Sequence, residues 1–181
     1  MPLTPFHLGP GLLIGLILLN LIDFPTFLIA SVIVDVEPII VILFDLDYPL
    51  HGFCHSFLGG TIIAFLLAAV MSKIRKPISP LLSFFKLEQE ISFKRILVAA
   101  LAGVYIHILL DAPIYTDIQP LFPLDINPFY RSSGAPGLME TMICVWCFMG
   151  AVPVYLIILL QAWRTSRKIN SIEQKTSPVL D

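Results

Sequence analysis

The sequence predicts an all-α, polytopic membrane protein, with short broken helices in its N-terminal third and about three full spans after them. Hydrophobic residues make up 57% of the 181 positions and charged residues 13%, whereas a soluble domain carries about 25% charged residues. The apolar residues stand in long runs rather than in alternation, and the mean hydropathy is +0.88. One domain fits this length, and a net charge of −2 gives no reason to expect a nucleic-acid partner.

The N-terminal third consists of three apolar runs, Gly11 to Ile22, Thr26 to Val34 and Ile39 to Phe44. The first would cover roughly 18 Å as a helix, which is too short for a hydrocarbon core of ~30 Å. Pro25 and Pro38 separate the runs, because proline disfavours helix at the residue before it. We therefore expect broken or re-entrant helices, which membranes tolerate only where they are buried in protein or line a cavity.

The rest of the chain alternates apolar spans with polar segments. We expect full spans over Phe57 to Ser72, Ile96 to Leu110 and Leu138 to Trp163. Lys73 to Pro77 should close the first span, and a polar loop should follow over residues 78–95. Residues 115–136 form a long Pro-rich loop, of a length that is usually functional or disordered. The predicted organisation is a single membrane-embedded helical domain over residues 1–163 and a polar cytoplasmic tail over 164–181.

The basic residues predict the orientation. Alternating spans place ten of the eleven lysines and arginines on one side, which the positive-inside rule makes cytoplasmic. Only Arg131 falls on the other side. If the first two short runs form a hairpin that turns at residues 23–25, all four histidines gather at the non-cytoplasmic face. We therefore expect an integral protein of the cell membrane with its C-terminus in the cytoplasm.

The histidines and nearby carboxylates predict a metal site at that face. His107 and Asp111 are four residues apart and share one face of their predicted helix, and His51 and His55 have the same spacing and would share a face if helix begins near Pro49. Imidazole and carboxylate are ligands of zinc and similar divalent ions. The candidate residues are His7, Asp35, Glu37, His51, His55, His107 and Asp111.

An alternative is that these residues are helix caps and core residues, with Asp111 at a helix end and Asp35 and Glu37 as caps. An ionisable group at membrane depth is expensive, which favours a functional site. Arg131 has two equally weighted interpretations, an ion pair with Glu140 or a clamp on a substrate phosphate.

Several short motifs together resemble the membrane-bound metal-dependent hydrolases, a family also described as LexA-binding, inner-membrane-associated hydrolases. The motifs are Thr4-Pro-Phe-His7-Leu-Gly9, Asp35-Val-Glu-Pro38, His51-Gly-Phe-Cys-His55-Ser56 and His107-Ile-Leu-Leu-Asp111. Their order is more remotely similar to zinc-dependent phospholipase C and the zinc nucleases, which cleave phosphate esters. This resemblance implies that Asp35, His55, His107 and Asp111 hold one metal. It also implies that Asp111 bridges to a second metal held by His7, whereas a third site is absent because no histidine follows His107.

The sequence thus predicts a membrane-embedded hydrolase of phosphate esters, of a lipid or a lipid-linked compound. One or two divalent ions, with zinc favoured, would activate water and polarise the phosphoryl oxygen. Glu37 or His51 would accept the proton, and Arg131 would bind the substrate. The alternative is a non-enzymatic membrane protein in which the same residues hold a structural or a transported metal ion.

Overall fold

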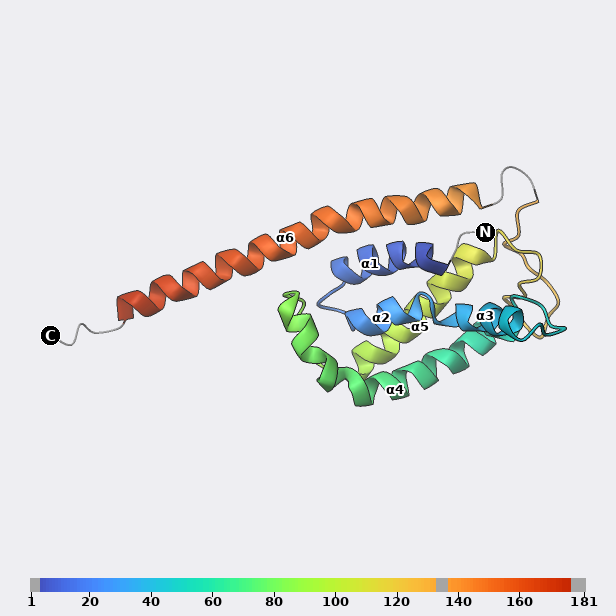
Figure 1. The fold of residues 1–181 in the computed structure, drawn as a ribbon, viewed down its shortest axis with the longest axis horizontal. Helices are drawn as coiled ribbons and strands as arrows, with labels where there is room; N and C mark the ends of the chain where they lie inside the picture. The colour runs from blue at the N-terminus through green and yellow to red at the C-terminus, as the bar shows by residue number, and fades with distance from the viewer. Residues whose placement is uncertain (1–3, 133–136, 177–181) are drawn as a thin grey trace.

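The computed structural model describes residues 4–132 and 137–176, and every regular element in these ranges is helical (Figure 1). Among these residues, four helical stretches are long and apolar enough to cross a membrane, which confirms the predicted fold class and gives four candidate spans where the sequence predicts about three. The α-helices are α1 (Leu8–Ile17), α2 (Phe24–Ala30), α3 (Val36–Leu43), α4 (Phe57–Phe84), α5 (Phe93–Asp111) and α6 (Leu138–Thr176). Short 3₁₀ turns are η1 (Thr4–His7), η2 (Ile33–Asp35) and η3 (Phe53–His55).

The additional span arises because α2, η2 and α3 join into one helical stretch, Phe24–Leu43. Pro38 does not break it, because this proline is the third residue of α3 and lies in the first turn, where its missing N–H is not needed. The break before α2 is real. Asp23 caps α2 by accepting a hydrogen bond from the Thr26 amide at 3.2 Å, and Pro25 lies in the first turn.

Two predicted helix ends are wrong. α4 continues through Pro77 and Pro80 to Phe84, so the polar loop shrinks to residues 85–92. Figure 1 shows a bend in α4, as expected where proline removes backbone hydrogen bonds. The second half of α4 is retained because Leu82 packs into a cluster of buried apolar side chains with Leu87 and Ala151. The expected tail is also helical as far as Thr176, and residues 177–181 lie outside the described part.

The helices α2 and α5 pack closely against each other in the centre of the bundle. A Cβ atom added at Gly103 of α5 would lie 2.5 Å from Ala30 Cβ and 2.9 Å from the Phe27 carbonyl oxygen, both in α2. Only glycine allows this approach, which is typical of small residues between membrane helices. α4 packs on the other side of α5, and α1 packs against α6 (Figure 1).

A buried ion pair joins α2 to α4 at the end of the bundle away from the histidines. Arg75 Nε donates to Asp23 Oδ2 at 2.5 Å, and both side chains are 1% exposed. Gln89 donates to the Leu19 and Ile22 carbonyl oxygens and accepts from the Phe24 amide, so it closes the connection between α1 and α2. These contacts fix the helices relative to one another at one end, while their histidine-bearing parts meet at the other.

Candidate metal centre

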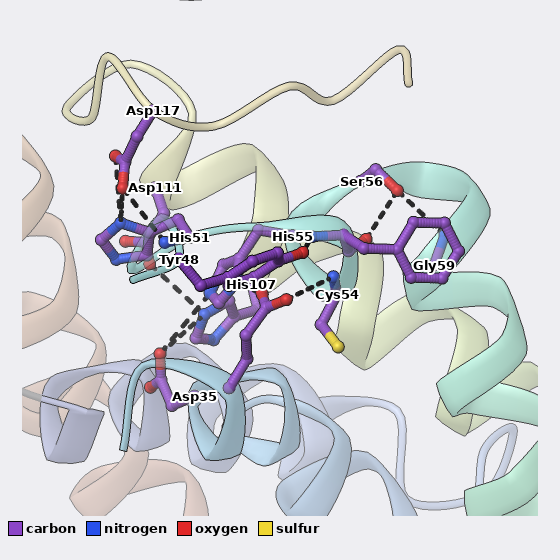
Figure 2. A network of polar contacts seen from close by, with 12 residues as sticks. Asp35, Tyr48, His51, Cys54, His55, Ser56, Gly59, His107, Asp111 and Asp117 are labelled. Atoms are coloured by element: carbon purple, nitrogen blue, oxygen red, sulfur yellow. Dashed lines mark hydrogen bonds and ion pairs between the residues drawn. The ribbon is translucent and has the colours of Figure 1, made fainter. Parts of the chain in front are cut away.

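Four buried side chains converge at the end of the bundle opposite the Asp23–Arg75 pair. Asp35, His55, His107 and Asp111 each offer one ligand atom, and these four atoms lie within 4.8 Å of one another. They come from three separate elements, η2, η3 and the last turns of α5 (Figure 2). Thus the structure brings together four of the five residues that were predicted as metal ligands.

Local structure explains how each histidine reaches the centre. Ser56 caps α4 by accepting from the Gly59 amide at 2.9 Å, which fixes the residue directly after His55. His107 and Asp111 are four residues apart on α5, so they share one face of that helix. α5 ends at Asp111, two residues before a proline that cannot continue it.

Hydrogen bonds on the far sides of both rings orient them. His107 Nδ1 lies 2.8 Å from the Ser31 carbonyl oxygen, and His55 Nδ1 lies 2.9 Å from Glu37 Oε2. Both oxygens can only accept, so each Nδ1 carries the proton. Each neutral ring then presents the lone pair of Nε2 to the centre, which is how metal-binding histidines are commonly held.

The distances inside the cluster fit a metal ion better than direct hydrogen bonds. His107 Nε2 is 3.3 Å from both Asp35 Oδ1 and Asp111 Oδ2, and His55 Nε2 is 3.8 Å from Asp35 Oδ1. A tetrahedral zinc with bonds of ~2.0–2.1 Å separates its ligand atoms by roughly 3.3 Å.

Four atoms of the cluster are buried without any hydrogen-bond partner among the described residues. They are Nε2 of His55, Nε2 of His107, Asp35 Oδ2 and Asp111 Oδ1. Buried polar atoms normally have hydrogen-bond partners. A cation bound between these atoms would satisfy them, and the group offers the nitrogen and oxygen ligands that such an ion requires.

His7 is also in the cluster but lies outside the four-ligand group. Its Nε2 is 3.1 Å from Asp111 Oδ1, and its ring centroid is 4.2 Å from that of His107. Asp111 therefore presents one oxygen to His107 and the other to His7. Within the described ranges, His7 Nδ1 is buried without a hydrogen-bond partner. This arrangement suits either a carboxylate that His7 orients or a carboxylate shared between two ions.

Asp117 is a site residue that the sequence reasoning missed. It accepts from the His51 amide at 3.0 Å, and both of its oxygens lie 3.2 Å from His51 Nδ1 (Figure 2). The His51 ring packs on Tyr115 and stands edge-on to His55 at 4.8 Å. Asp117 lies in the long Pro-rich loop without a spacing motif, so only the suspicion that this loop is functional pointed to it.

The surroundings move the pKa values of the two neighbouring histidines in opposite directions. Burial lowers the pKa of His51, and the adjacent His55 lowers it further against the opposing effect of Asp117. Burial also disfavours the charged form of His55, but the carboxylates of Asp35 and Glu37 outweigh it and raise the pKa of His55. The carboxylates of Asp35 and Glu37 therefore stabilise a positive charge beside His55, and a cation bound at Nε2 of the neutral ring supplies that charge as well as a proton does.

Glu37 and Arg131 occupy positions that bear on their predicted roles. Glu37 Oε1 accepts from the Cys54 amide at 3.1 Å while Oε2 faces His55, so both oxygens are engaged. Arg131 Nη1 lies 3.8 Å from Glu140 Oε1, which is one of its two predicted partners. Its role as a phosphate clamp stays a prediction.

No protein-family model, no curated protein and no solved structure matches this chain. The resemblance to the membrane-bound metal-dependent hydrolases therefore stays a prediction, and the site's geometry carries the functional argument.

Proposed function

We propose that this protein is a membrane-embedded, metal-dependent hydrolase of phosphate esters, with a lipid or lipid-linked substrate. The observation that supports this most strongly is the convergence of Asp35, His55, His107 and Asp111. Their Nε2 nitrogens and two of their carboxylate oxygens have no hydrogen-bond partner in the part of the chain that the structure describes. Two imidazoles and two carboxylates are a ligand set that zinc accepts. A divalent ion held there supplies Lewis-acid activation of water and of a phosphoryl oxygen.

A polar cleft of about 270 Å³ beside the centre gives water and a phosphate group a place to enter. Its lining includes His51, Asp117 and Gln119. Asp117 holds the His51 ring through Nδ1, which leaves Nε2 free to accept a proton from water in the cleft. Since both oxygens of Glu37 are engaged, the geometry favours His51 as the proton acceptor and Glu37 as the group that orients His55.

The divided contacts of Asp111 support the second ion of the prediction. With Oδ2 towards His107 and Oδ1 towards His7, this carboxylate can serve two ions without moving its backbone. The distribution of basic residues supports placing the whole centre at the non-cytoplasmic face and the C-terminus in the cytoplasm.

One observation favours a second candidate function. Four buried protein ligands are the usual set of a structural zinc site, whereas a catalytic ion typically keeps three and a water. The same residues could therefore hold a structural ion, or a transported one, in a non-enzymatic membrane protein. The polar cleft at His51 and the split contacts of Asp111 favour the hydrolase.

Metal analysis of detergent-purified protein tests the centre. We expect about one equivalent of metal or more in wild type and loss of most of it in His55→Ala and Asp111→Ala. Asp47→Ala, which removes an exposed carboxylate outside the cluster, should keep the wild-type content. Equally little metal in wild type and all three variants contradicts the centre.

Turnover of bis(4-nitrophenyl) phosphate and of phospholipid vesicles by the metal-loaded protein then separates the two functions. His51→Ala should keep the metal but lose about 10²–10⁴-fold in rate, the usual contribution of a positioned base. Wild-type protein that binds metal but hydrolyses neither substrate supports the non-enzymatic alternative.

A further inference from the structure

An apolar cleft of about 380 Å³ lies beside the metal centre, on the other side of Glu37 from His55. Its walls are η2, α3, the segment that leads into η3, Cys54 of η3 and one side chain of α4. The apolar lining residues include Val36, Ile40, Leu46 and Ile63. This volume lies within the range of small-molecule pockets, about 300–1,000 Å³.

Two residues belong to both the cleft and the surroundings of the metal centre. Glu37 lines the cleft and also holds His55 Nδ1 at 2.9 Å. Cys54 lines it as well, and its amide donates to Glu37 at 3.1 Å. A molecule in the cleft therefore lies one side chain away from a predicted metal ligand.

The outer side of α3 is an exposed apolar surface. Ile39, Ile42 and Leu43 are 52%, 64% and 72% exposed, and Ile40, which lines the cleft, is 42% exposed. α3 belongs to a stretch that can cross a membrane, so this surface faces hydrocarbon. A lipid chain can thus move sideways from the bilayer into the cleft without passing through water.

Tyr48 lines both this apolar cleft and the polar cleft at His51, so the two clefts meet at this residue. Its hydroxyl oxygen accepts from the Phe53 amide at 2.9 Å, which holds the ring against Gly52. A Cβ at Gly52 would lie 2.2 Å from the Tyr48 ring, so the ring can keep this position only beside a glycine. The result is an apolar compartment and a polar compartment that meet at Tyr48, both adjacent to His51–His55.

We infer that the apolar cleft binds the linear hydrocarbon chain of an amphiphilic substrate whose phosphate head lies in the polar cleft at the metal centre. This inference rests on the proposed function and narrows its substrate to lipids that carry a linear hydrocarbon chain and a phosphate ester at the head. A helix of a partner protein does not fit, because at a diameter of ~10–12 Å it would fill the cleft with roughly 4 Å of its length. A hydrocarbon chain is narrow enough to enter.

The test uses hexadecyl phosphate with a diazirine at the far end of its chain, added to the full-length protein in lipid nanodiscs. After illumination, mass spectrometry locates the labelled peptides. We expect labelling of residues 36–54 that excess hexadecyl phosphate removes and excess ethyl phosphate does not. Ile40→Trp and Leu46→Trp, which fill the cleft from two walls, should reduce this labelling about tenfold, because a tryptophan ring leaves no room for the chain. Ile39→Trp, on the same helix but outside the cleft, is the matched control and should label as wild type does.

Equal labelling of residues 36–54 in the two cleft variants and the control overturns the inference. Labelling that excess hexadecyl phosphate does not reduce overturns it as well. Metal content and hydrolysis of bis(4-nitrophenyl) phosphate are measured on the same samples. Protein that holds metal and hydrolyses this ester but shows no competed labelling refutes the chain site alone. Competed labelling in protein that holds no metal refutes the proposed function and leaves the chain site standing.

Discussion

Replacing Glu37 by Gln should weaken metal binding although Glu37 is not one of the four converging ligands. Glu37 Oε2 lies 2.9 Å from His55 Nδ1, and Oε1 accepts from the Cys54 amide at 3.1 Å. Glutamine offers one carbonyl oxygen and one NH₂ group. One of the two donors, His55 Nδ1–H or the Cys54 amide, would then face another donor, and His55 would lose a negatively charged partner.

The expected magnitude follows from that geometry. A hydrogen bond to a charged group contributes about 1.5–3 kcal/mol, which corresponds to roughly 10–100-fold in an equilibrium constant. Substituting the groups that orient metal-bound histidines costs about 10–100-fold in metal affinity, the same range. The Glu37 side chain is 9% exposed, so water screens this interaction little.

Competition with a chromophoric zinc chelator measures the affinity of purified protein. Glu140→Gln is the matched control, because the Glu140 side chain is also 9% exposed but pairs with Arg131 rather than with the cluster. Affinity of Glu37→Gln that matches both wild type and this control would refute the orienting role. If turnover is lost while the affinity is unchanged, Glu37 instead accepts the proton, which is one of the two roles that its position in the sequence predicts.

Three further outcomes are expected away from the ligands. Arg75→Met leaves Asp23 buried without its counter-ion, so the free energy of unfolding should fall by about 3–5 kcal/mol, and an unchanged denaturation curve in detergent contradicts this. Gly103→Ala should destabilise the bundle by about 1–3 kcal/mol in the same assay. Gly150→Ala, where an added methyl would lie 3.3 Å from the nearest side-chain atom, should change little, and equal losses at both positions would remove the argument from close helix packing. With the native cysteines replaced, Leu124→Cys should react with a membrane-impermeant maleimide from the non-cytoplasmic side, and reaction only from the cytoplasmic side reverses the proposed orientation.

Helix ends were harder to predict than helices. From the sequence, Pro38 and Pro77 predict breaks, yet Pro38 lies in the first turn of α3 and Pro77 in the interior of α4. A local pattern gives the cost of a proline but not the tertiary packing that offsets it. Leu82, buried against Leu87, is the kind of contact that keeps α4 helical beyond Pro77.

The sequence by itself determined the class of the protein and the chemistry of its candidate ligands. Hydropathy is a sum over neighbours in the chain, so long apolar runs predict membrane helices without any knowledge of packing. The shared face of His107 and Asp111 likewise follows from helix geometry alone, and the cost of ionisable groups at membrane depth favours a functional site over caps and core residues. The set of Asp35, His55, His107 and Asp111 as ligands of one ion was predicted from the family resemblance.

The tertiary structure decided which of these groups meet and what holds them. The Ser31 carbonyl oxygen orients His107, Glu37 orients His55, and Asp117 holds His51, although 76, 18 and 66 residues separate these pairs in the chain. No local pattern encodes such partners, because they depend on how closely α2 approaches α5 at Gly103 and on where the Pro-rich loop folds back. His55 belongs to the four converging ligands and His51 does not. Three-dimensional packing decides this, because the four-residue spacing of the pair does not distinguish one histidine from the other.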